Sequence, residues 1–66
     1  MIKELEQPDN LLLLTIPEAA KRLSLSPAKL YELIARKKGP MVIHIGRSAR
    51  IATTDLRLWI DQQPRE

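Results

Sequence analysis

The sequence contains no cysteine, no phenylalanine, one histidine and only two glycines. Without cysteine there can be no disulfide framework, and the lone His44 has no cysteine partners, so we expect no zinc or other metal site. A glycine-rich phosphate loop is excluded as well, because Gly39 and Gly46 stand apart. Tyr31 and Trp59 are the only aromatic residues. Leucine, isoleucine and alanine must therefore fill the core.

Long apolar runs are also missing, the longest being residues 11–14. A membrane-spanning helix needs roughly 20 predominantly apolar residues. The first residues include Lys3, Glu4 and Glu6 and contain no hydrophobic stretch of signal-peptide length. We therefore expect no membrane segment, no secretion and a cytoplasmic location.

Residues typical of catalytic sites are few. Ser24, Ser26 and Ser48 carry nucleophilic hydroxyls, but no pair of carboxylates has a spacing typical of acid–base catalysis. The only imidazole, that of His44, falls in a segment that we predict to be a strand. We therefore expect neither an enzyme nor a bound cofactor.

The length of 66 residues allows one domain, because independent domains need roughly 50 residues or more. Residues 1–10 mix both charges with a proline and show no periodicity, which indicates a flexible N-terminal arm. A single domain is expected over residues 11–64. A core of this size should give modest stability, which a ligand or a second copy of the chain can increase.

The net charge of +3 is unevenly distributed along the chain. Residues 1–20 have one lysine against four carboxylates, a net charge of −3. Residues 21–50 have eight cations against Glu32 alone, a net charge of +7, and residues 51–66 have a net charge of −1. A basic centre of this kind indicates a polyanionic partner.

Two helices are predicted in the first half of the chain. Thr15 and Glu18 have the spacing of a capping box, which predicts a helix from this point to about Leu23. Ser26 can cap a second helix, with Pro27 at its favoured first position. Residues 11–14, before the first helix, are expected to be extended.

The second predicted helix has one apolar stripe, formed by Leu30, Leu33 and Ile34. The opposite face is largely polar. The helix should end near Lys37 or Lys38, because Gly39 supplies a C-terminal turn and Pro40 cannot extend a helix.

A β-hairpin and a third helix are predicted after residue 41. A β-branched run over residues 42–45 ends at Gly46 and resumes at Arg50 and Ile51, with a turn formed by residues 46–49. Thr53 or Thr54 is expected to cap the last helix. Its predicted buried stripe consists of Leu56, Trp59 and Ile60. This order of elements predicts a mainly α fold with a small β-hairpin, the winged helix-turn-helix.

Such a fold has a known physical use. The second helix can enter the major groove of DNA while the first crosses the phosphate backbone. The hairpin should project Arg47 and Arg50. A guanidinium there can enter a narrow minor groove or pair with phosphates.

The chain also resembles the excisionase family over roughly residues 11–62. The residues that carry this resemblance are Leu14-Thr15-Ile16-Pro17-Glu18-Ala19-Ala20, Leu23, Leu25-Ser26-Pro27, Leu30-Tyr31, Leu33-Ile34, Gly39-Pro40, Gly46-Arg47, Asp55-Leu56 and Trp59-Ile60. The family is related to the DNA-binding domains of MerR-type regulators and includes AlpA-like phage regulators. The resemblance implies a small bacterial or phage protein that binds DNA near attachment sites or promoters.

The expected DNA-binding residues fall on both helices and the hairpin. They are Lys21, Arg22, Ser26, Ala28, Lys29, Tyr31, Glu32, Arg36, Arg47, Ser48 and Arg50. Lys21 and Arg22 are expected to contact phosphates. Glu32 can either accept a hydrogen bond from a cytosine amine or pair with Arg36 at helical spacing. Tyr31 can either pack at the edge of the core or donate to a phosphate.

Three functions remain open at this point. The first is an excisionase that bends or coats attachment-site DNA beside an integrase, in the bacterial cytosol and on the nucleoid when bound. The second is an AlpA-like transcriptional regulator that uses the same contacts. The third is a protein-interaction adapter that uses residues 11–14 or the last helix, where Leu58 lies off the buried stripe. Double-stranded DNA is the expected partner, with an integrase and further copies of the chain as additional ones.

Overall fold

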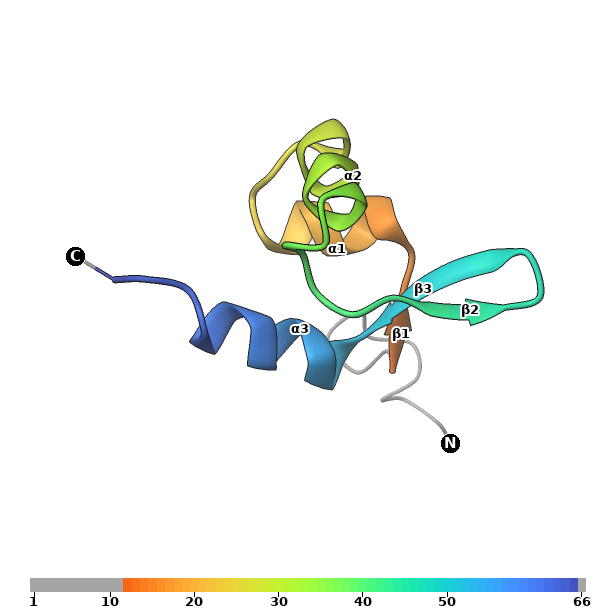
Figure 1. The fold of residues 1–66 in the computed structure, drawn as a ribbon. Helices are drawn as coiled ribbons and strands as arrows, with labels where there is room; N and C mark the ends of the chain where they lie inside the picture. The colour runs from red at the N-terminus through yellow and green to blue at the C-terminus, as the bar shows by residue number, and fades with distance from the viewer. Residues whose placement is uncertain (1–11, 66) are drawn as a thin grey trace.

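The computed structural model describes residues 12–65. Their elements follow the order β1 (Leu13–Leu14), α1 (Ile16–Arg22), α2 (Pro27–Ala35), β2 (Ile43–Ile45), β3 (Ser48–Ala52) and α3 (Thr53–Asp61). Figure 1 shows α1 and α2 together, the β2–β3 hairpin extending to one side and α3 to the other. This arrangement confirms the predicted winged helix-turn-helix. The arm expected over residues 1–10 lies outside the described residues.

The first helix begins where the sequence predicts. The Thr15 hydroxyl accepts a hydrogen bond from the Glu18 N–H at 3.1 Å, and the Glu18 carboxylate accepts one from the Thr15 N–H at 2.8 Å. These reciprocal bonds satisfy two backbone donors and form a capping box. Ile16, Ala19 and Ala20 then turn one face of α1 into the core.

The turn between α1 and α2 is short because Ser24 adopts a left-handed conformation, with φ of 60°. The Ser24 N–H donates to the Lys21 carbonyl at 3.1 Å, and the Leu25 N–H donates to the Ala20 carbonyl at 2.9 Å. This is the Schellman pattern of helix ends, here without glycine. The chain then enters α2, where the Ser26 hydroxyl accepts from the Lys29 N–H at 3.1 Å, as predicted.

The end of α2 differs from the prediction. The helix ends at Ala35 instead of near residues 37–38, and Arg36 is its C-cap. Lys37 takes the left-handed conformation that was assigned to Gly39, with φ of 62°. The N–H of Lys38 donates to the Leu33 carbonyl at 2.9 Å and closes the helix. Gly39 serves another purpose, because a Cβ there would lie 3.1 Å from the Ile34 side chain.

The hairpin also has a tighter turn than predicted. Ile45 pairs with Ser48, so the turn contains only Gly46 and Arg47, and Ser48 already belongs to β3. Gly46 has φ of 60° and open space around its Cα. A glycine with positive φ at the first turn position is typical of type II′ hairpins, whose twist matches that of the strands. The prediction that residues 46–49 form the turn was therefore too long.

The sheet has the order β1-β3-β2, and its central strand leads directly into α3. The Thr53 N–H donates to the Leu12 carbonyl at 3.0 Å, so the backbone is still paired with the first strand where α3 begins. Ala52 is therefore the N-cap, without a side-chain hydrogen bond. The prediction of a Thr53 or Thr54 cap was wrong, because the chain passes from strand to helix without a loop.

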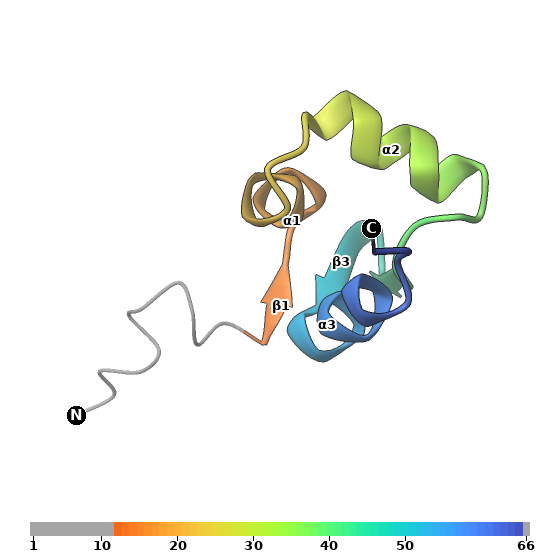
Figure 2. The same cartoon turned by 90° about the vertical axis from the view of Figure 1, so that its left-hand side faces the viewer.

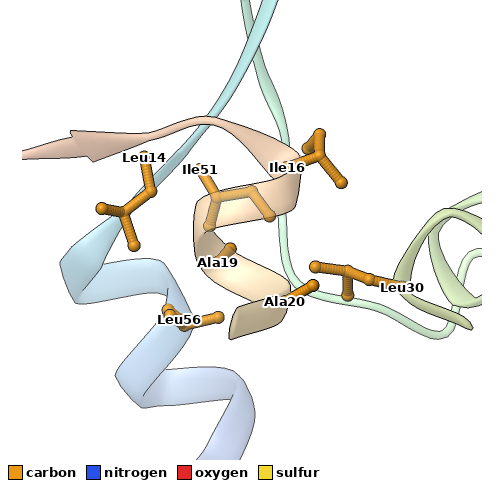
Figure 3. Close-up of a cluster of buried hydrophobic side chains, with 7 residues drawn as sticks. All are labelled: Leu14, Ile16, Ala19, Ala20, Leu30, Ile51 and Leu56. Atoms are coloured by element: carbon orange, nitrogen blue, oxygen red, sulfur yellow. The ribbon is translucent and has the colours of Figure 1, made fainter. Parts of the chain in front are cut away.

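The core draws one to three side chains from each of five elements (Figure 3). Its members are Leu14, Ile16, Ala19, Ala20, Leu30, Ile51 and Leu56. Figure 2 shows α1 end-on with α2 extending beside it, and in Figure 3 Leu30 of α2 points towards Ala20 of α1. Of the stripe predicted in α3, Leu56 is buried and Trp59 half-buried, whereas Ile60 is 40% exposed. The prediction for Ile60 was wrong, because only one edge of α3 meets the core.

Replacing Ser24 by glycine should raise the free energy of unfolding by about 1 kcal/mol. Glycine adopts positive φ without the steric cost that an L-residue incurs there. Urea denaturation of the two proteins measures the difference. Ser24→Ala is the control, since alanine retains the strain and should give no gain; equal stabilisation by both substitutions would contradict this explanation.

The stability of α1 should depend on the ionisation of Glu18. Hydrogen bonds from Thr15, its backbone N–H first, hold the pKa of Glu18 below its ordinary value, and the charges of Arg50 and Arg22 act in the same direction. The folded state thus favours the carboxylate. Its contribution is fully present above the ordinary glutamate pKa and is lost as the pH falls through the lowered value.

Glu18→Gln keeps an acceptor for the Thr15 N–H but cannot titrate. We therefore expect the urea midpoint of Glu18→Gln to decrease less than that of the wild type between neutral pH and pH values below the lowered pKa. Parallel pH profiles for the two proteins would show that Glu18 does not carry this dependence.

Candidate nucleic-acid interface

The solvent face of α2 is largely polar and accessible. Leu30 is buried and Leu33 and Ile34 are half-buried, which turns the opposite side of the helix outward. The exposed residues of α2 and its C-cap are Pro27, Ala28, Lys29, Tyr31, Glu32, Ala35 and Arg36. Ser26, at the N-cap, is exposed as well. The helix expected to read DNA is therefore not sunk in the interior.

Glu32 joins two cations on this face. Its Oε2 lies 3.1 Å from Nη2 of Arg36, one turn further along, and its Oε1 lies 3.7 Å from Nζ of Lys29. The pair with Arg36 is one of the two alternatives that the sequence left open. The pair with Lys29 was missed, although the i, i+3 spacing of the two residues indicates it. The three side chains form one charged cluster in solvent.

Tyr31 lies on the surface beside this cluster. Its exposed fraction is 51%, so it does not pack in the core. Packing at the edge of the core and a hydrogen bond to a phosphate both stay predictions for Tyr31. The phenol can donate or accept one hydrogen bond at the edge of α2.

The two wing arginines have different environments. Arg47 and Ser48 are exposed at the hairpin tip. Arg50 is half-buried further down β3, and its Nη1 donates to the Ala49 carbonyl at 2.9 Å. The expectation that the hairpin projects both arginines is therefore corrected: the tip presents Arg47, while Arg50 folds back along its own strand.

Arg22, at the end of α1, lies beside α3. Lys21 and Arg22 are exposed in the last turn of α1. The charges of Arg50 on β3 and of Arg22 on α1 both help to lower the pKa of Glu18, after the hydrogen bonds from Thr15. Arg22 also lines a shallow groove towards α3, together with Arg57. Arg57 was not considered in the sequence, where nothing marks its proximity to Arg22.

A hydrogen bond from α3 fixes the segment between α2 and the wing. Trp59 Nε1 donates to the Lys38 carbonyl at 2.9 Å, across 21 positions of the chain. Lys38 directly follows Lys37, the residue with positive φ just after the end of α2. Trp59 therefore anchors the point at which the chain leaves α2. The sequence predicts a structural role for Trp59 but gives no sign of this partner.

The described residues offer little for other chemistry. Residues 12–65 contain no group of three histidine, cysteine or acidic side chains that could hold a metal ion. His44 is exposed on β2, in the strand where it was predicted. No helix within this part of the chain has the length and apolarity needed to cross a membrane.

The tight α1–α2 turn, the exposed face of α2 and the adjoining hairpin define a winged helix-turn-helix, a class of domain that binds double-stranded DNA. Comparison with protein families bears this out. Residues 13–64 match a family described as a helix-turn-helix domain, and the chain belongs to this family. A comparison with curated proteins finds no match.

Trp59→Phe should lower the free energy of unfolding by about 0.5–1.5 kcal/mol, the usual net contribution of one hydrogen bond. Phenylalanine keeps most of the apolar ring but removes the N–H that binds the Lys38 carbonyl. Urea denaturation measures the change. Leu58→Ala, at a neighbouring position that is 59% exposed, is the control and should have little effect. A similar loss in both variants would argue against a specific role for this bond.

Proposed function

We propose that the chain binds double-stranded DNA sequence-specifically, with α2 in the major groove and the tip of the hairpin on the neighbouring minor groove or phosphates. The observation that carries this proposal is the exposed face of α2, which presents Lys29, Tyr31, Glu32 and Arg36 to solvent while the apolar stripe packs against the core. A helix supported in this way can meet base edges with its side chains. The wing supplies a second contact outside the core.

The proposed contacts divide by position. The cations at the end of α1, Lys21 and Arg22, bind phosphates and set the register of the domain. The residues on α2 face the bases: Ser26, Ala28, Lys29, Tyr31, Glu32 and Arg36. Arg47 and Ser48 at the hairpin tip reach the minor groove or backbone. Arg50 supports them from the strand, since its guanidinium is partly engaged by the Ala49 carbonyl.

The biological role that we propose is that of an excisionase, acting in the cytoplasm beside an integrase on attachment-site DNA. The motif order from the capping box at Thr15 to the closing helix supports this role, because it resembles excisionases. One domain of this size contacts few base pairs, so several copies should bind side by side. The alternative role is that of a promoter-binding regulator of the AlpA type, which uses the same contacts. The genes next to the gene of this protein distinguish the two roles: an adjacent integrase gene supports excision, and a regulated operon supports transcription control.

Duplex binding with strong salt dependence is the first test of DNA binding. Titrations at several salt concentrations, followed by fluorescence anisotropy, should give a log–log slope of about −0.9 for each phosphate contact. A flat response would reject DNA binding and favour a protein-interaction adapter.

Arg47→Ala should weaken duplex binding and reduce the size of this slope by about 0.9, because one phosphate or groove contact is lost. Unfolding by urea should be unchanged, since Arg47 is exposed at the tip. Arg65→Ala is the matched control: it removes the same charge beyond the end of α3, where Arg65 pairs with Asp61 at 3.7 Å. Equal losses in the two variants would refute the placement of the wing on DNA.

A further inference from the structure

We propose that Glu32 is the residue that limits α2 to selected sequences. Its carboxylate holds Lys29 and Arg36 away from phosphates on random DNA and releases them where an exocyclic amino group of cytosine or adenine takes their place. The inference deepens the proposed function and depends on it. It is carried by the two ion pairs that converge on Glu32 in the middle of the exposed face.

Glu32 is an isolated negative charge in a basic part of the sequence. It is the only acidic residue among residues 21–50, a segment with eight cations. It is also 44% exposed, so the low dielectric of a core does not force it to pair. Nevertheless Lys29 Nζ, one turn before Glu32, lies 3.7 Å from its carboxylate, and Arg36 Nη2, one turn after it, lies 3.1 Å away. On the surface that faces DNA, one carboxylate thus neutralises part of two cations.

Every base pair presents one amino group in the major groove, but on a non-matching sequence it does not lie at the position that Glu32 reaches. The phosphates compete with Glu32 for Lys29 and Arg36, and they can win, because exposed ion pairs are weak. Glu32 then stands unpaired against a polyanion. Either the cations stay with Glu32 and make no phosphate contacts, or they leave and the carboxylate is repelled. Both outcomes weaken non-specific binding.

A matching sequence removes this conflict. The major groove presents two kinds of hydrogen-bond donor, cytosine N4 and adenine N6. An ionised carboxylate only accepts hydrogen bonds, so it can bind either amine but not the acceptors of guanine and thymine. With the amine bound to Glu32, both cations are free to contact phosphates. The hydrogen bond from the amine and the phosphate contacts of the two cations therefore strengthen binding on the same sequences.

Glu32→Gln tests the restraint on random DNA. Measured with a random-sequence duplex at low salt, its affinity should exceed that of the wild type by about fivefold, and the salt slope should steepen by about 0.9 for each cation that gains a phosphate. Glu32→Ala should behave in the same way on random DNA, which separates the loss of charge from new hydrogen bonds made by glutamine.

Asp61→Asn is the matched control for net charge. It also removes a carboxylate that forms an ion pair on a helix surface: Asp61, the last residue of α3, lies 3.7 Å from Arg65. We expect its affinity for the random duplex to stay close to that of the wild type. If Asp61→Asn strengthens binding as much as Glu32→Gln does, the effect comes from total charge and the proposal is overturned.

Selection from a randomised duplex library tests the sequence preference. The wild type should enrich cytosine or adenine at one or two adjacent positions, and Glu32→Ala should lose the preference there while keeping the others. Unchanged preferences, or weaker binding of random DNA by Glu32→Gln, would overturn the role of Glu32. A wild type that binds no duplex at all would instead overturn the proposed function, so the two failures can be told apart.

Discussion

The contact of Leu30 with α1 is the interaction on which the rest of the molecule depends. Of the nine residues of α2, Leu30 alone is buried, and Figure 3 shows it pointing towards Ala20. The small side chain of Ala20 leaves room for Leu30 against α1. Leu33 and Ile34, both half-buried, pack against the same core and help to hold α2 in place. The orientation of α2 on the domain therefore depends on these three side chains, and the other side of the helix is left open to solvent.

Local rules in the sequence predicted the starts of α1 and α2 well, and the end of α2 and the cap of α3 less well. The caps at Thr15 and Ser26 act within one helical turn, so the residues themselves determine them. The end of α2 depends on Lys37 taking a conformation that usually favours glycine, and sequence preference pointed to Gly39 instead. The start of α3 depends on β1 pairing with β3, which brings residues 12 and 53 together across 41 positions. Such long-range pairing leaves no trace in the periodicity of α3 itself.

The candidate site was likewise predictable from the sequence only in part. Helical spacing predicted which side chains of α2 face solvent and that Glu32 can pair with Arg36. Tertiary contacts decided the rest: the bond from Arg50 to its own strand, the nearness of Glu18 to Arg50 and the bond from Trp59 to Lys38. The basic charge that marks the central segment in the sequence is thus partly matched by carboxylates in the folded chain. Its distribution in space, more than its sum, determines how the surface meets a polyanion.

The distance that the wing, the β2–β3 hairpin, extends from the domain can change through the length of its two strands, because a two-residue turn joins them directly. Ile51 of β3 belongs to the core and Ala49 packs against it, while the turn between β2 and β3 extends away from the helices in Figure 1. Two residues added to each strand would carry the tip about 7 Å further and keep every inward side chain on its face. Relatives with the same helices can therefore span different distances along a duplex by changing ribbon length alone. The body of the domain and the length of its wing are free to evolve separately.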